Sequence, residues 1–145
     1  MGIPYLRLST KEAGNGQCSQ EIEGPADQVW AALADFHNVH KRVAPGFVID
    51  SKSDGDARIV KFSNGTNARE VLVDRDAKLR RFVYAVTGSE RLTHHSASVQ
   101  VFAEANVHSR LLWIADFLPS ELAPYIDAQM EAASVIMKRT LAEQC

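Results

Sequence analysis

The feature that most constrains the fold is a series of six short strand-like segments that occupies residues 47–119. Turns separate the segments, and two of them, Asp54-Gly55 and Asn64-Gly65, are strong hairpin signals. Strands joined by tight turns pair in antiparallel fashion, so the series predicts one antiparallel meander. The expected strands cover residues 47–50, 58–62, 69–73, 79–86, 95–103 and 111–118.

A helix is expected before the meander and a longer one after it. Pro25 opens the first helix, where its missing N–H costs nothing, and Val29, Leu33 and Phe36 form an apolar stripe of helical period. A weak strand at 18–23 precedes this helix, and a second helical turn at 37–42 follows it. The last helix repeats its apolar residues every three or four positions, at Leu122, Ile126, Met130, Ala133, Met137 and Leu141. The order β-α-α-β-β-β-β-β-β-α predicts an α+β domain in which a curved sheet wraps a helix.

Size and composition indicate a single globular domain. The 145 residues are 46% hydrophobic and 23% charged, a balance typical of a chain that buries its own core. Gly14-Asn15-Gly16 closes an expected N-terminal arm, residues 1–16, and the domain is expected to cover residues 17–145. A formal net charge of −2 argues against a nucleic-acid partner, because such a partner requires a strongly basic face.

No membrane segment, disulfide framework or metal site is indicated. The chain has no apolar run long enough to span a bilayer, so we expect no stable membrane insertion and a cytoplasmic location. Cys18 and Cys145 lie near opposite ends without a partner motif. His37 and His40 are three residues apart, but no third ligand stands near them, so no metal is expected. Without a nucleotide-binding or phosphate-binding motif we expect no cofactor. A monomer and a homodimer are both compatible with the sequence.

Alternation along the strands predicts which side chains face the interior. Phe82, Tyr84 and Val86 share one face of their strand, and we take the more apolar face of each strand as concave. The expected interior, closed by the last helix, is Phe82, Tyr84, Val86, Ala97, Val99, Val101, Trp113, Ala115, Met130, Ala133 and Met137. The alanines leave space that larger residues would fill, which indicates an apolar ligand cavity between helix and sheet. A close-packed core without a cavity is the alternative.

Three polar residues are candidates for chemistry in such a cavity, and each has a structural alternative. Glu70, if it points inward, is a desolvated carboxylate that could orient a hydroxyl or act as acid or base; otherwise it is solvated and paired with a cation such as Arg69. In the first case, replacing Glu70 by Gln leaves stability nearly unchanged or raised. Tyr84 could hydrogen-bond a ligand or pack as a core aromatic residue. His94-His95 places one imidazole on each sheet face, so His95 could transfer protons inside or be a satisfied structural histidine.

Several short motifs follow one another in a set order along the chain. They are the helix at 25–36, Arg69-Glu70, Asp74, Tyr84, Leu111, Trp113, Pro119 and the closing amphipathic helix. Together, from residue 17 to the C-terminus, they resemble the START-like (SRPBCC) superfamily, and more narrowly its polyketide cyclase/dehydrase and lipid-transport group. The resemblance implies a helix-grip fold, in which a seven-stranded antiparallel sheet curls around the C-terminal helix and leaves a mostly apolar cavity. One departure is Arg42-Val43-Ala44-Pro45, where relatives often carry Trp-x-Pro.

Glu70, Tyr84 and the segment 90–92 (Glu-Arg-Leu) are also similar, more distantly, to the plant abscisic-acid receptors. This resemblance implies that Glu70 is a pocket residue and that Arg91 belongs to a loop that latches over the ligand. The proline-bearing gate of those receptors is replaced here by residues 63–67 (Ser-Asn-Gly-Thr-Asn), so hormone reception as in plants is not implied.

Three functional hypotheses follow. The first is a binding protein that holds a small hydrophobic or aromatic molecule between the last helix and the sheet. The second is an enzyme of polyketide cyclase or dehydratase type, in which Glu70, Tyr84 or His95 supplies acid–base help. The third is a protein-interaction domain whose outer sheet face carries apolar residues. Those outward residues are Val83, Ala85 and Ile114. An enzyme requires two titratable groups that converge on one point, whereas a carrier requires only one polar anchor.

Overall fold

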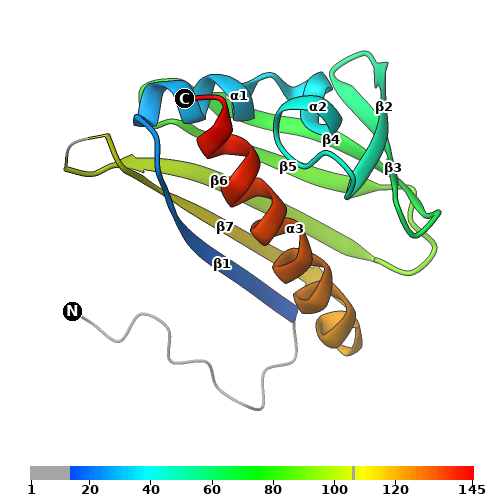
Figure 1. The fold of residues 1–145 in the computed structure, drawn as a ribbon. Helices are drawn as coiled ribbons and strands as arrows, with labels where there is room; N and C mark the ends of the chain where they lie inside the picture. Colours follow the sequence, from blue (N-terminus) through cyan, green and yellow to red (C-terminus); the bar gives the residue numbers. More distant parts are fainter. Residues whose placement is uncertain (1–13, 106) are drawn as a thin grey trace.

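An antiparallel sheet curled around one long helix dominates the computed structural model, which describes residues 14–105 and 107–145 (Figure 1). Within these residues the sheet has seven strands in the order β1-β7-β6-β5-β4-β3-β2. Their bounds are β1 Gly14–Ile22, β2 Val48–Asp54, β3 Ala57–Phe62, β4 Asn67–Asp76, β5 Arg81–Thr87, β6 His94–Ala103 and β7 Ser109–Leu118. Strands β2 to β7 follow one another as a meander, and β1 pairs with β7. The expected topology is therefore confirmed.

Helical segments lie before the meander and after it. The bounds are α1 Ala26–Ala34, η1 Phe36–Asn38, α2 Val39–Arg42, η2 Ser120–Leu122 and α3 Ala123–Glu143. Pro25 precedes α1 and Pro124 lies in the first turn of α3, where a proline removes no intrahelical hydrogen bond. Figure 1 shows α3 running diagonally across one face of the sheet, with α1 and α2 near its C-terminal end. This arrangement is the α+β helix-grip that the resemblance implied.

Strand β1 begins earlier than the sequence suggested, and the expected boundary of the arm at residue 16 falls inside it. Gly14 and Gly16 pair with Phe117 and Ala115 of β7. A Cβ atom at Gly14 would lie 2.0 Å from the Phe117 ring, and one at Gly16 would lie 2.6 Å from the Met130 sulfur. These glycines therefore mark a close approach of the strand to the core and do not form a linker. The rest of the expected arm, residues 1–13, lies outside the described residues.

Strands β2 and β4 are longer than expected, and each contains a bulge. The pairing register shifts between Leu72 and Asp74 in β4 and between Val48 and Asp50 in β2. The extra residue of a bulge has no partner in the ladder. Here the extra residues are Val73 and Ile49, which are 60% and 50% exposed. Alternation beyond Val73 is consequently out of phase. The strand expected from the sequence ended at Val73, before the charged residues 74–76, which the structure includes in β4.

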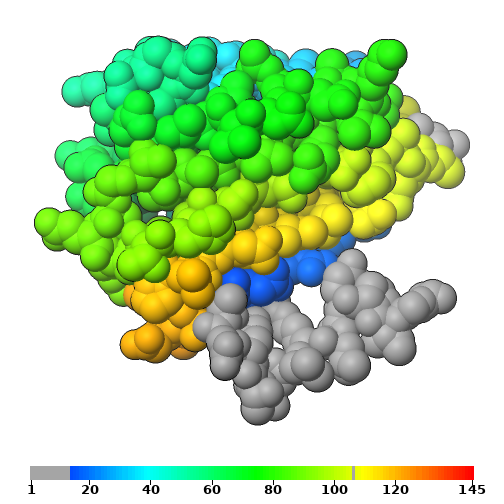
Figure 2. Space-filling model, turned by 180° about the vertical axis from the view of Figure 1, so that it is seen from behind, coloured from blue at the N-terminus to red at the C-terminus, as the bar shows by residue number. Residues whose placement is uncertain are grey.

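The concave face of the sheet is the one that alternation predicted. On β6 and β7 the inward residues are buried, and α3 covers them with its own buried face. The buried residues of these three elements include Ala97, Val99, Val101, Leu111, Ala115, Phe117, Met130, Ala133, Met137 and Leu141. The C-terminal part of α3, red in Figure 1, is not seen in Figure 2, which shows the opposite face of the sheet. Val83, Ala85 and Ile114 are half-buried and are not among the large apolar residues that the described chain exposes.

The contact between Gly14 and Phe117 gives a test of the first strand. We expect Gly14→Ala to lower the free energy of unfolding by about 1–3 kcal/mol, because the added methyl group displaces a fully buried aromatic ring. Gly16→Ala is the matched control, and we expect a smaller loss because the Met130 side chain is flexible. Urea unfolding measures both variants. Equal stability of Gly14→Ala and the wild type would contradict the pairing of β1 at this end.

Candidate functional site

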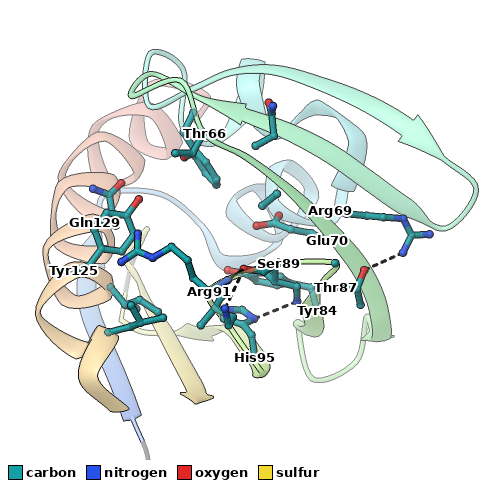
Figure 3. Close-up of a pocket in the computed structure, with 18 of the residues that line it drawn as sticks. Thr66, Arg69, Glu70, Tyr84, Thr87, Ser89, Arg91, His95, Tyr125 and Gln129 are labelled. Atoms are coloured by element: carbon teal, nitrogen blue, oxygen red, sulfur yellow. Dashed lines mark hydrogen bonds between the residues drawn. The ribbon is translucent and has the colours of Figure 1, made fainter. Parts of the chain in front are cut away.

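A cavity of about 520 Å³ opens between the first turns of α3, strands β3 to β6 and the two loops that follow β3 and β5 (Figure 3). Apolar and aromatic side chains make up most of its wall: Phe47, Ile59, Phe62, Ala68, Tyr84, Val86, Leu92, Trp113, Leu122, Tyr125, Ile126 and Met130. Polar residues and glycine complete the lining: Thr66, Asn67, Arg69, Glu70, Thr87, Gly88, Ser89, Arg91, His95 and Gln129. The volume and the lining suit one small organic molecule.

The structure divides the residues expected at the ligand site into three groups. The first lines the large cavity: Glu70, Tyr84, Val86, Arg91, His95, Trp113 and Met130. The second lines a smaller cavity of about 70 Å³: Phe82, Val99, Ala133 and Met137. Glu70, Tyr84 and Trp113 border both cavities. The third group, Ala97 and Ala115, is buried in the core and lines neither cavity.

A row of small residues explains why the large cavity does not lie beside the alanines. Gly16, Ala115 and Ala97 are register partners across β1, β7 and β6. The Met130 side chain packs against Gly16, so the helix occupies the space that the small residues leave. The large cavity lies instead between α3 and strands β3 and β4, where aromatic residues are part of its lining. Small residues here allow close packing of the helix and do not produce the large void.

A buried ion pair lies between the two cavities. The Arg58 Nε and Nη2 atoms are 2.8 and 2.7 Å from Glu70 Oε1, and the two residues are only 5% and 7% exposed. Arg58 also donates from Nη1 to the backbone carbonyl of Phe36, at 2.6 Å. Its guanidinium carbon lies 3.8 Å from the centre of the Phe36 ring and 5.6 Å from that of Tyr84. This cation was missed by the sequence analysis, although alternation with Val60 on the same strand could have placed it inside.

The position of Glu70 corrects the expectation that it pairs with Arg69. Arg69 points away from the cavity, as Figure 3 shows, and bonds to Asp54 at 2.8 Å and to Thr87 at 3.0 Å. Neighbours along a strand face opposite sides of the sheet, so Arg69 and Glu70 cannot meet. With Arg58 beside it, Glu70 is half of a salt bridge and not an isolated carboxylate.

Tyr84 and Trp113 form a hydrogen-bonded aromatic pair at the inner end of the cavity. The Trp113 indole N–H donates to the Tyr84 hydroxyl oxygen at 3.1 Å. Burial raises the pKa of Tyr84 well above its ordinary value, and the charge of Glu70 raises it further. Tyr84 therefore keeps its proton at neutral pH and is a hydrogen-bond donor, not a base.

His95 lies beside Tyr84, with 5.7 Å between the ring centres. Its Nδ1 accepts a hydrogen bond from the backbone N–H of Val86 at 3.3 Å, so the neutral ring carries its proton on Nε2. Burial lowers the pKa of His95, although the charge of Glu70 partly opposes this effect. A neutral imidazole therefore lines the cavity at physiological pH.

Tyr125 of α3 connects two loops across the mouth of the cavity. Asn64, in the loop after β3, donates to its hydroxyl oxygen at 3.2 Å. Arg91, in the loop after β5, places its guanidinium carbon 4.8 Å from the centre of the Tyr125 ring. Ser89 Oγ accepts the backbone N–H groups of Arg91 and Leu92, at 3.1 and 3.0 Å, and holds this second loop in a turn. Figure 3 shows the Arg91 side chain reaching toward α3.

The remaining candidate residues lie away from the cavity. His37 and His40 line neither cavity, and the structure places no metal-binding group of three or more His, Cys, Asp or Glu within residues 14–105 and 107–145. Cys18 and Cys145 are free thiols. Among the helices of the same residues, none is long and apolar enough to cross a membrane.

Comparison of the sequence with known protein families identifies the family of this chain. Residues 17–143 match the family described as polyketide cyclase/dehydrase and lipid transport. The chain belongs to this family. No curated protein sequence matches this member of the polyketide cyclase/dehydrase family.

Solved structures show the same fold at low sequence identity. A protein from Bacillus thuringiensis has a TM-score of 0.78 at 18% identity and covers 88% of this chain and 98% of its own. A norcoclaurine synthase from Thalictrum flavum has a TM-score of 0.73 at 15% identity, with 94% and 98% covered. The Zhui aromatase/cyclase of a Streptomyces species has a TM-score of 0.72 at 17% identity, with 91% and 93% covered. At these identities the likeness establishes the fold of this family member and leaves its ligand open.

The buried ion pair overturns the expectation that Glu70→Gln is harmless to stability. We expect this substitution to lower the free energy of unfolding by about 3 kcal/mol or more, because it leaves the Arg58 charge buried without its counter-ion. Asp54→Asn, at the exposed pair with Arg69, is the control, and its expected cost is below about 1 kcal/mol. Urea unfolding measures both. Equal costs for the two variants would contradict the buried pair.

The environment of His95 predicts a dependence of stability on pH. The unfolded chain binds a proton at this residue near pH 6.5, whereas the folded chain binds it only at lower pH. The folded state therefore loses stability as the pH falls below about 6.5. We expect the free energy of unfolding, measured in urea from pH 8 to about pH 5, to fall less steeply in His95→Gln than in the wild type. Identical slopes would show that His95 titrates equally in both states.

Proposed function

We propose that this protein binds a small hydrophobic or aromatic molecule in the large cavity. The observation that carries the proposal is the lining of that cavity: an apolar and aromatic wall with a few polar groups at its inner end and its mouth. Sites for small organic ligands have this composition, because burial of apolar surface drives binding and a few polar groups orient the ligand.

The side chains at the inner end of the large cavity can form hydrogen bonds with a ligand, and together they carry no net charge. Tyr84 keeps its proton, His95 is neutral, and the charges of Glu70 and Arg58 compensate each other at 2.7 Å. A ligand carbonyl or hydroxyl group can be recognised there without the cost of burying an ion. The polar groups therefore favour a neutral oxygen on the part of the ligand that enters first.

The same geometry favours binding over catalysis. Acid–base catalysis requires groups whose proton affinities are matched to the working pH. Glu70 is held in a salt bridge, and the raised pKa of Tyr84 makes it a poor proton donor or base at neutral pH. His95 is then the one cavity-lining residue, within the described chain, that is suited to take a proton near neutral pH. One such group serves a carrier, whereas a cyclase or dehydratase needs a second.

A cyclase or dehydratase activity is the second candidate, and the contact between His95 and Tyr84 favours it. The ring centres of the two residues are 5.7 Å apart, so the neutral imidazole could act as base while the Tyr84 hydroxyl orients a carbonyl of the same ligand. Two of the structural neighbours are described as a norcoclaurine synthase and an aromatase/cyclase. His95→Gln separates the candidates, because it abolishes turnover of a cyclisable substrate while a purely binding function loses only one hydrogen bond.

The uncharged dye N-phenyl-1-naphthylamine tests the binding function, since its fluorescence rises in apolar sites. We expect a dissociation constant of about 1–10 μM for the wild type. Ala68→Phe places a ring in the large cavity and should weaken binding at least about tenfold. Val135→Phe adds the same ring on α3 at a position that is 60% exposed, and it should bind the dye as the wild type does.

Circular dichroism confirms that both variants are folded before the titrations. Unchanged dye binding in a folded Ala68→Phe protein would place the dye outside this cavity. No dye binding by the wild type would contradict the proposed function. Native mass spectrometry of the purified protein then identifies any small molecule that it retains.

A further inference from the structure

Among the charged residues that the structure describes in the cavity lining, one has no counter-ion of opposite charge beside it. Three residues of the lining carry a formal charge: Arg69, whose guanidinium points away from the cavity, Glu70 and Arg91. Glu70 is paired with Arg58, and Arg69 is paired with Asp54 at 2.8 Å. Among the residues that the structure describes, no carboxylate lies within ion-pair distance of Arg91, and its neighbour Glu90 forms no such pair either. The lining therefore has one uncompensated positive charge, at the mouth.

The position of this charge is held from two sides. The Tyr125 ring supports the Arg91 guanidinium, with 4.8 Å between them. Ser89 Oγ accepts two backbone N–H groups of the loop and sets the direction from which Arg91 leaves the chain. Ordering a long side chain in this way lowers the conformational entropy that a ligand would otherwise remove on binding.

A guanidinium without a counter-ion is well suited to an acid group. Its planar N–H groups match two oxygens of a carboxylate or a similar anion, and stacking over an aromatic ring leaves the N–H groups at its edge available. Among residues 14–105 and 107–145, the inner end of the cavity holds no uncompensated cation, so the favourable partner that these residues offer to an acid group is at the mouth.

We propose that the ligand is an amphipathic organic acid, whose apolar or aromatic body fills the cavity and whose anionic group binds Arg91. This inference rests on the proposed binding function and specifies the chemical class of the ligand. Under this inference, Arg91 is the residue that makes the protein bind an organic acid more tightly than a neutral molecule of the same shape.

Two dyes that share one aromatic skeleton test the inference. 1-Anilinonaphthalene-8-sulfonate carries an acid group, and N-phenyl-1-naphthylamine has the same rings without it. We expect Arg91→Gln to weaken the sulfonate dye about fivefold or more and to change binding of the neutral dye by less than about twofold. Arg91→Lys keeps the charge and should retain part of the preference for the sulfonate.

Arg69→Gln is the control, because the Arg69 guanidinium points away from the cavity and already has a carboxylate partner. It should leave the ratio of the two affinities unchanged, and Ala68→Phe should weaken both dyes if both occupy the cavity. Equal weakening of both dyes by Arg91→Gln would show that Arg91 only braces Tyr125 and would overturn the inference while the binding function stands. An equal effect of Arg69→Gln on the sulfonate dye would also overturn it. Failure of the wild type to bind either dye would overturn the proposed function, and this inference with it.

Discussion

The buried pair of Arg58 and Glu70 is the interaction on which the rest of the site depends. It joins β3 to β4 at the point where both strands reach the cavity, and its bond to the Phe36 carbonyl attaches η1 to the same point. Two buried ions at 2.7 Å hold their geometry, because separating them leaves an uncompensated buried charge. The nearby charge of Glu70 also affects the proton affinities of Tyr84 and His95.

Small and large residues on the concave face decide where α3 touches the sheet and where it does not. Gly16, Ala115 and Ala97 let Met130 pack closely at one end. Phe47, Phe62 and Trp113 line the large cavity, which opens toward the loops after β3 and β5. The long helix is thus both part of the core and one wall of the binding site.

The cavity is neutral inside and positive at its mouth. The inner groups offer hydrogen bonds but no net charge, and Arg91 supplies the uncompensated cation near solvent. Such a gradient favours a ligand that enters with its uncharged end first and leaves an acid group at the entrance, because burying a lone charge is costly. Carriage of an amphipathic molecule fits both parts of the cavity, and the family to which the chain belongs is described by cyclisation, dehydration and lipid transport.

Much of the architecture followed from local patterns in the sequence. Turn signals at Asp54-Gly55 and Asn64-Gly65 and the two-residue alternation predicted the meander, its concave face and the inward positions of Tyr84 and His95. The partner of Glu70, the packing at Ala97 and Ala115, and the contact of Arg91 with Tyr125 were decided only by the tertiary structure. Hydrophobic period and turn chemistry act between near neighbours in the chain. Ion pairs, ring contacts and cavities arise between side chains on different strands and helices, and pairing register, bulges and helix position determine which of them meet.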